Sequence, residues 1–204
     1  MKVAIFSGAP FESVQIEDYT VLICADKGYL YARNLGVKPN FILGDFDSLG
    51  FVPDGAETYS ADKDLSDLEL AIDKAISLKA TEVDMYFCLG GRIDHELFNV
   101  FLLKKCKENG LKARILTQTQ VIELINYTDN HTVFKCKDGG TVSLVPYSDE
   151  VSFIGSDGLK YDLKGVISTR GKTLTLSNQA KGSSFIVEIK SGEALLITER
   201  KFNP

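Results

Sequence analysis

Four short segments between residues 25 and 95 combine aspartates with lysine, arginine or glycine. They are Ala25-Asp26-Lys27-Gly28, Gly44-Asp45-Phe46-Asp47-Ser48, Lys63-Asp64-Leu65-Ser66-Asp67 and Gly90-Gly91-Arg92-Ile93-Asp94-His95. Carboxylates brought close together repel one another unless a cation screens them, and Mg²⁺ accepts oxygen ligands while it keeps several waters. Lysine and arginine side chains suit phosphate oxygens. These residue types together predict one site for a divalent metal ion and a polyphosphate, and hence phosphoryl-group chemistry.

The Gly-Asp-Phe-Asp-Ser segment is the sharpest of the four signals. On an extended loop, Asp45 and Asp47 can reach one cation, and Gly44 lets the backbone approach a ligand closely. The structural alternative is an Asx turn capped by Ser48, because aspartate and serine favour turns through their own hydrogen bonds. The presence of the other acidic segments favours metal binding.

The Lys63–Asp67 segment lies at the expected start of a helix over residues 66–79. Asp64 is a good N-cap, and Ser66-Asp67-Leu68-Glu69 fits the capping-box pattern. Asp64 and Asp67 lie about 60° apart on a helical wheel, so both carboxylates can point the same way from the first turn. Capping does not require Lys63, and a helix N-terminus also favours anionic phosphate. We therefore expect phosphate or metal binding here, together with capping.

The Gly-Gly-Arg-x-Asp-His segment is expected between a strand and a helix. Its paired glycines can turn backbone N–H groups toward a phosphate, with Arg92 as a bidentate clamp. The alternative is a glycine-permitted turn that carries a surface pair of Arg92 and Asp94. His95 fits a positioning or capping role better than that of a general base.

The first part of the chain alternates apolar runs with patterns of helical spacing. The runs are residues 3–6, 21–25, 85–89 and 114–116, and the helical patterns cover residues 28–35, 66–79 and 95–109. This alternation predicts a mainly parallel sheet covered by helices. In open α/β sheets the ligand crevice lies at the carboxyl ends of the strands. We therefore expect the acids, although distant in sequence, to converge at one edge of the sheet.

From about residue 121 the pattern changes to short strands separated by turn residues. The expected strands are residues 121–127, 132–136, 141–146, 151–154, 159–163, 173–177, 184–189 and 194–198. Closely spaced strands of this kind predict a β-sandwich. The expected fold class is thus α/β plus β, with an α/β domain over residues 1–120 and a β-sandwich domain over residues 121–204.

Composition limits the function classes. Of the 204 residues, 44% are hydrophobic and 25% charged, and the net charge of -5 argues against a nucleic-acid surface. No apolar stretch approaches the ~18 residues of a membrane helix, and the N-terminal apolar run is too short for a signal peptide. The four cysteines are widely spaced and indicate reduced thiols rather than a metal or redox centre. We therefore expect a cytoplasmic protein with no membrane or nucleic-acid partner.

Taken in order, these segments resemble the thiamine pyrophosphokinase (thiamin diphosphokinase) family. The Asp-x-Gly, Gly-Asp-Phe-Asp-Ser, Lys-Asp-x-Ser/Thr-Asp-x-Glu and Gly-Gly-Arg-x-Asp-His elements all match, and Asn99 falls where the family has an asparagine. Gly158-Leu159-Lys160-Tyr161-x-Leu163 and Ser177-Asn178 look like the family's β-domain signatures. Two features depart from the family. Lys27 stands where many relatives have glycine, and the chain has no tryptophan to pack on thiamine.

The resemblance implies that the terminal diphosphate of ATP is transferred to the hydroxyethyl oxygen of thiamine, giving thiamine diphosphate and AMP. It also implies a homodimer, in which the β-sandwich of one subunit helps to build the thiamine site against the α/β domain of the other. Local chemistry agrees, because diphosphoryl transfer needs charge neutralisation and alignment more than a covalent nucleophile.

Roles for individual residues follow from the resemblance and the local chemistry together. We expect Mg²⁺ ligands at Asp45, Asp47 and Asp67; ATP contacts at Asp26, Gly28, Lys63, Gly90, Gly91, Arg92 and His95; catalytic groups at Lys63, Asp64, Arg92 and Asp94; and thiamine contacts at Asp94, Asn99, Ser177 and Asn178. Either Asp64 or Asp94 can orient or deprotonate the attacking hydroxyl.

Two rival functions remain compatible with the same residues. One is a different Mg²⁺-dependent phosphotransferase or pyrophosphatase that acts on another small substrate. The other is a sensor that binds a nucleotide or a thiamine phosphate without turnover. The products formed from ATP and thiamine distinguish all three.

Overall fold

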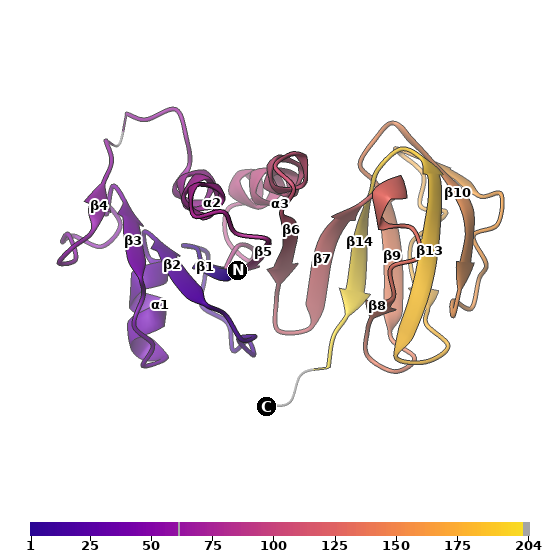
Figure 1. Ribbon diagram of the computed structural model, residues 1–204, viewed down its shortest axis with the longest axis horizontal. Helices are drawn as coiled ribbons and strands as arrows, with labels where there is room; N and C mark the ends of the chain where they lie inside the picture. Colours follow the sequence, from indigo (N-terminus) through magenta and orange to yellow (C-terminus); the bar gives the residue numbers. More distant parts are fainter. Residues whose placement is uncertain (61, 202–204) are drawn as a thin grey trace. The chain divides into compact units, whose positions relative to one another are not determined.

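The chain folds into two compact units. The computed structural model describes residues 1–60 and 62–201, and its contacts divide the chain after Thr117 (Figure 1). The sequence placed this boundary after residue 120. All three α-helices of the described residues lie in the first unit, whereas the second consists of strands and one short 3-10 helix, η1 (Tyr127–Asp129).

The first unit is built on a parallel sheet of six strands in the order β6-β5-β1-β2-β3-β4. The strands are β1 (Lys2–Phe6), β2 (Val21–Ala25), β3 (Phe41–Gly44), β4 (Glu57–Thr58), β5 (Glu82–Tyr86) and β6 (Lys112–Leu116). The central strands read as continuous apolar runs because helices cover both faces of the sheet. This arrangement confirms the predicted α/β architecture.

Three differences from the expected strands have local causes. The sequence missed β3 and β4, because β3 has only four residues before the acidic loop and β4 has two. The run expected over residues 85–89 instead ends as a strand at Tyr86. Phe87 adopts a left-handed backbone, with φ of 56°, and this turns the chain out of the sheet.

Three helices pack on the sheet: α1 (Gly28–Asn34), α2 (Asp67–Ser77) and α3 (Ile93–Glu108). Figure 1 shows α2 and α3 on one face and α1 on the other. The start of α2 corrects a prediction. Ser66, not Asp64, is the N-cap, since its hydroxyl accepts from the Glu69 N–H at 3.2 Å. Asp64 therefore lies outside the first helical turn that it was expected to share with Asp67.

The second unit contains two antiparallel sheets, in the orders β12-β9-β14-β7 and β11-β10-β13-β8. The strands are β7 (Gln120–Ile125), β8 (Phe134–Lys135), β9 (Thr141–Pro146), β10 (Glu150–Asp157), β11 (Ile167–Thr169), β12 (Asn178–Gln179), β13 (Ser184–Ser191) and β14 (Ala194–Glu199). Buried side chains from both sheets, such as Leu144 and Leu196 from one and Phe153 and Val187 from the other, form a single core. The unit is therefore the predicted β-sandwich.

Two strands expected in this unit are not formed. Residues 159–163 form an isolated β-bridge, between Leu159 and Ala180, rather than a strand. The Tyr161 N–H donates to the Asn178 side chain, at 3.1 Å from Oδ1, and is therefore not available to a neighbouring strand. Residues 173–177 form a turn that ends at Ser177, whose φ is 57°. The sequence missed β11 and β12, which lie beside these segments.

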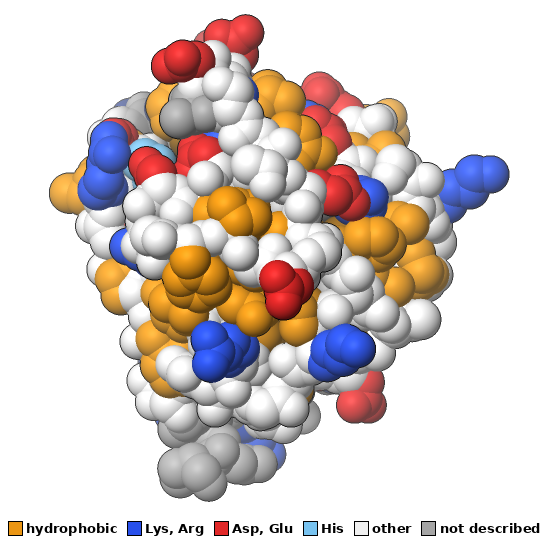
Figure 2. Space-filling model, turned by 90° about the vertical axis from the view of Figure 1, so that its left-hand side faces the viewer, with side chains coloured by type: hydrophobic (Ala, Val, Ile, Leu, Met, Phe, Trp, Pro, Cys, Tyr) orange, Lys and Arg blue, Asp and Glu red, His pale blue; other side chains and the backbone are white. Residues whose placement is uncertain are grey.

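The surface carries charges of both signs. On the face drawn in Figure 2, Lys and Arg side chains are scattered among acidic and hydrophobic ones. Among the described residues, no helix combines the length and the apolar character that crossing a membrane requires.

Candidate active site

A cavity of about 610 Å³ lies in the first unit, at the carboxyl ends of its parallel strands. Loops after β1, β2 and β3 line it, together with the starts of α2 and α3. Nine residues expected in the site line this cavity: Asp26, Asp45, Asp47, Lys63, Asp67, Gly91, Arg92, His95 and Asn99. The sheet thus gathers side chains that are more than 70 residues apart in sequence.

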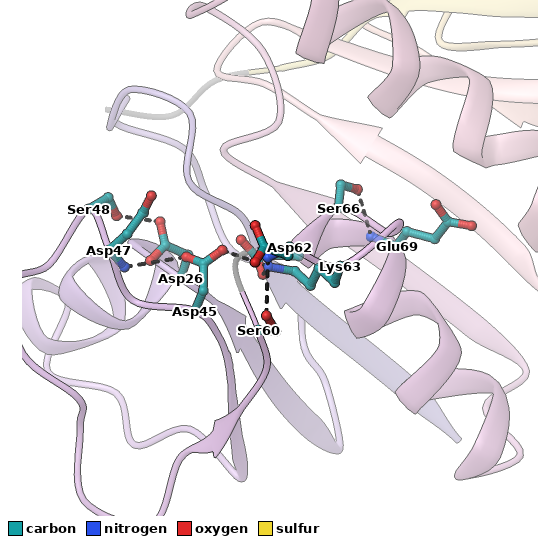
Figure 3. A network of polar contacts seen from close by, with 10 residues as sticks. Asp26, Asp45, Asp47, Ser48, Ser60, Asp62, Lys63, Ser66 and Glu69 are labelled. Carbon is teal, nitrogen blue, oxygen red and sulfur yellow. Dashed lines mark hydrogen bonds and ion pairs between the residues drawn. The ribbon is translucent and has the colours of Figure 1, made fainter.

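Three carboxylates form the acidic centre of the cavity. Asp26, Asp45 and Asp47 each offer an oxygen, and these oxygens all lie within 4.8 Å of one another (Figure 3). Between the last two, Phe46 has a φ of 60° and a side chain that is only 2% exposed. Its buried ring anchors the loop while the aspartates on either side remain at the cavity. The expected metal set contained Asp67 in place of Asp26.

Lys63 lies between two of the acids. Its Nζ is 2.7 Å from Asp45 Oδ2 and 3.2 Å from Asp67 Oδ1. The hydrogen bond from Lys63 lowers the pKa of Asp45. Burial opposes the charge of Lys63, but its hydrogen bonds to Asp45 and Asp67 outweigh burial and raise its pKa. Lys63 therefore stays protonated and holds a positive charge at the acidic centre.

Asp67, the second carboxylate beside Lys63, is partly buried. Burial raises the pKa of Asp67 above its ordinary value, and the attraction of Lys63 only partly offsets that effect. Asp67 is the first residue of α2, so its carboxylate also lies at the positive end of a helix.

Arg92 and Asp94 form an exposed ion pair, which is the structural alternative to phosphate binding that was considered for the Gly-Gly-Arg-x-Asp-His segment. Arg92 donates from Nε to Asp94 Oδ1 at 3.1 Å and from Nη2 to Oδ2 at 2.6 Å. Their side chains are 72% and 56% exposed. The hydrogen bonds from Arg92 lower the pKa of Asp94. Arg92 lines the cavity, whereas Asp94 does not.

Two side chains of α3 hold the loop between β5 and α3. Gly90, with φ of 96°, donates its N–H to Glu96 Oε1 at 3.0 Å. Asn99 is 8% exposed and donates from Nδ2 to the Cys88 carbonyl oxygen at 2.8 Å. These bonds tie the helix to the end of the strand and fix the position of Gly91 and Arg92 at the cavity.

Gly28 has a packing role that the sequence did not indicate. A Cβ at this position would lie 2.0 Å from the Phe6 carbonyl oxygen. Gly28 therefore lets the start of α1 contact the end of β1 directly. Gly28 does not line the cavity, and neither do Gly90 and Asp64, both of which are exposed.

The sequence missed one wall of the cavity. Ser7, Gly8, Ala9 and Pro10 line it, and Tyr31 donates its hydroxyl to the Ala9 carbonyl oxygen at 2.7 Å. These residues directly follow β1, so the rule that placed Asp26 after β2 could have found them.

Ser177 and Asn178 belong to the second unit. Asn178 is 6% exposed, and its amide is used by the backbone: Oδ1 accepts from Tyr161 and Gln179, and Nδ2 donates to the Tyr161 carbonyl oxygen at 2.7 Å. Ser177 is exposed and donates its N–H to Ser143 Oγ at 3.0 Å. Asn178 thus connects two segments that the sequence singled out separately.

Comparison with known proteins establishes the family. A family model described as "Thiamin pyrophosphokinase, catalytic domain" matches residues 14–115, and another described as "Thiamin pyrophosphokinase, vitamin B1 binding domain" matches residues 130–196. The chain belongs to the thiamine pyrophosphokinase family. As a thiamine pyrophosphokinase family member, it is an enzyme that transfers a diphosphate group from ATP to thiamine to make thiamine diphosphate.

Individual relatives of the thiamine pyrophosphokinase family agree with this assignment. The chain is 28% identical over 189 residues to thiamine pyrophosphokinase from Bacillus subtilis (strain 168), covering 89% of this chain and 88% of that protein. The crystal structure of the Bacillus subtilis protein has the same fold, with a TM-score of 0.86 at 24% identity over 99% of this chain and 100% of its own. Thiamin pyrophosphokinase from Geobacillus thermodenitrificans gives a TM-score of 0.82 at 25% identity, covering 98% of both chains.

Proposed function

We propose that the diphosphate transfer takes place in the cavity of the first unit with Mg²⁺ held by Asp26, Asp45 and Asp47. The observation that carries the proposal is the convergence of their oxygens within 4.8 Å. A set of carboxylate oxygens suits Mg²⁺, and Asp26 Oδ1 is buried with no hydrogen-bond partner among the described residues. Mg²⁺ bound here would neutralise charge on the phosphate oxygens. Asp67, which is paired with Lys63, would help to hold the ion through a bridging water.

The cations of the site hold the phosphate chain of ATP. Lys63 is fixed by two carboxylates and brings one positive charge to the acidic centre. Arg92 lines the cavity with a largely exposed guanidinium that can turn to bind phosphate oxygens in a bidentate manner. The backbone N–H group of Gly91 and the side chain of His95, which both line the cavity, add further contacts, whereas the Gly90 N–H is already bonded to Glu96. Alignment of the diphosphoryl group by these residues is their main contribution to the rate.

The attacking hydroxyl of thiamine requires a group that orients it. Both expected candidates, Asp64 and Asp94, are exposed and do not line the cavity. We assign this role to Asp94, because its carboxylate is hydrogen-bonded to Arg92, which does line the cavity. The lowered pKa of Asp94 keeps it ionised as a hydrogen-bond acceptor. Asn99, Ser177 and Asn178 complete the thiamine site, with residues 121–204 as the thiamine-binding domain.

A product assay tests this function directly. With ATP, Mg²⁺ and thiamine, we expect AMP and thiamine diphosphate in equal amounts, and removal of Mg²⁺ with a chelator should abolish both. Added Mg²⁺ should restore the activity, which separates metal loss from unfolding. ADP formation, or phosphate release without thiamine, would instead indicate another phosphotransferase or a pyrophosphatase. Tight binding of both substrates without turnover would indicate a sensor.

We also propose that the chain acts as a cytoplasmic homodimer with substrate sites at the subunit interface. Helix α3 exposes Ile93, Leu97 and Phe98 by 73%, 54% and 71%, a larger apolar surface than a single helix of a monomer usually presents to water. We expect light scattering to give twice the 22.5 kDa mass of one chain. Phe98→Asp should shift the mass toward the monomer, whereas Phe51→Asp, at another exposed phenylalanine, should not. A monomeric wild type would contradict the proposal.

A further inference from the structure

Ser48 contacts a carboxylate of a different loop. Its hydroxyl donates to Asp26 Oδ2, across 22 residues of sequence (Figure 3). The two residues follow neighbouring parallel strands, Ser48 after β3 and Asp26 after β2. We propose that Ser48 is a positioning residue that fixes the Asp26 carboxylate and leaves Asp26 Oδ1 for the cation. The inference rests on the proposed Mg²⁺ site.

The backbone already fixes where the Asp26 side chain begins. The Asp26 N–H donates to the Leu43 carbonyl oxygen at 2.9 Å, and a Cβ on Gly44 would lie 3.2 Å from the Asp26 nitrogen. Asp26 itself has φ of 46°, in the left-handed region, which aspartate adopts more readily than most residues other than glycine. The two loops therefore form one rigid edge, and only rotation of the Asp26 side chain remains to be fixed.

Electrostatic repulsion makes this rotation important. Three carboxylate groups within 4.8 Å repel one another, and a side chain free to rotate would turn away from its neighbours. The Ser48 hydroxyl opposes that rotation, because it donates to one oxygen of Asp26 while the other oxygen is buried without a hydrogen-bond partner among residues 1–60 and 62–201. Groups that orient metal ligands in this way commonly contribute tenfold or more to metal affinity.

Binding of Mn²⁺ alone, followed by electron paramagnetic resonance, tests the role without reference to turnover. We expect Ser48→Ala to weaken Mn²⁺ binding about tenfold, and Ser48→Thr, which retains the hydroxyl, to stay within about twofold of the wild type. Ser60→Ala is the matched control, since the Ser60 hydroxyl accepts from the Asp62 backbone N–H in the neighbouring loop and Ser60 does not line the cavity, so the affinity should be unchanged. Thermal unfolding of each variant confirms that the fold is retained.

A double-mutant cycle with Asp26→Asn shows whether Ser48 acts through Asp26. We expect Asp26→Asn to weaken Mn²⁺ binding by itself and to abolish the further effect of Ser48→Ala. An equal effect of Ser48→Ala in both backgrounds would overturn the positioning role, as would wild-type affinity in Ser48→Ala. If the wild type fails to bind Mn²⁺, or Asp26→Asn binds it normally, the proposed metal site itself is wrong.

Discussion

Replacement of Asp47 by asparagine is expected to lower kcat by at least ~100-fold while the protein stays folded, because a metal ligand is lost. Asp47 is exposed and lies in a turn, where its backbone N–H donates to Asp45 Oδ1 at 3.3 Å. Asparagine keeps the shape of the side chain and this backbone bond but removes the negative charge. Steady-state formation of thiamine diphosphate measures the loss, and circular dichroism checks the fold.

Asp54→Asn is the matched control for this variant. Asp54 is also an exposed loop aspartate, but it does not line the cavity, so its substitution should leave kcat near that of the wild type. The Mn²⁺ affinity of Asp47→Asn should fall together with its kcat. A well-folded Asp47→Asn enzyme with normal turnover would remove Asp47 from the metal site.

Gly28→Ala is expected to destabilise the protein by about 3 kcal/mol, at the upper end of the cost of overpacking. The added methyl group would lie 2.0 Å from the Phe6 carbonyl oxygen, and neither backbone can move without displacing α1 or β1. Urea unfolding monitored by circular dichroism measures the change in the free energy of unfolding.

Gly182→Ala provides the comparison. A Cβ at Gly182 meets no atom within 4 Å, and its φ lies outside the left-handed region, so alanine should change stability by no more than about 0.5 kcal/mol. The two variants also distinguish the two roles considered for Gly28. If Gly28→Ala instead leaves stability unchanged and raises the KM for ATP, the result would support the ATP contact that the sequence suggested for Gly28.

The sequence identified most of the site because the residues follow strands. Asp26 comes directly after an apolar run, and Arg92 lies between a run and a helical pattern. Parallel strands bring their carboxyl ends to one edge, so residues in those positions meet whatever the details of the loops. The capping pattern at Ser66 was also readable, because a cap depends on residues only three apart.

The sequence was less informative where two groups compete for the same hydrogen bond. The interpretation of Asp64 as a cap failed because Ser66 supplies the hydrogen bond to Glu69 and starts the helix two residues later than a cap at Asp64 would. In the second unit, residues 159–163 have strand-like composition. The Asn178 side chain, however, forms hydrogen bonds with both the N–H and the carbonyl oxygen of Tyr161, which a strand would use to pair with its neighbour. Such bonds join residues 17 apart and leave no periodic signal in the sequence.

By itself, the sequence determined the α/β plus β architecture, the edge of the sheet at which the acids gather and the family. Local spacing and the order of strands are enough for these, since both are properties of neighbouring residues. Only the tertiary structure decided that Asp26 joins Asp45 and Asp47, that Lys63 bridges Asp45 and Asp67, and that Gly28 serves packing. Those outcomes depend on distances of a few ångströms between separate loops. The pairing of β2 with β3 and the packing of α1 on β1 determine these distances.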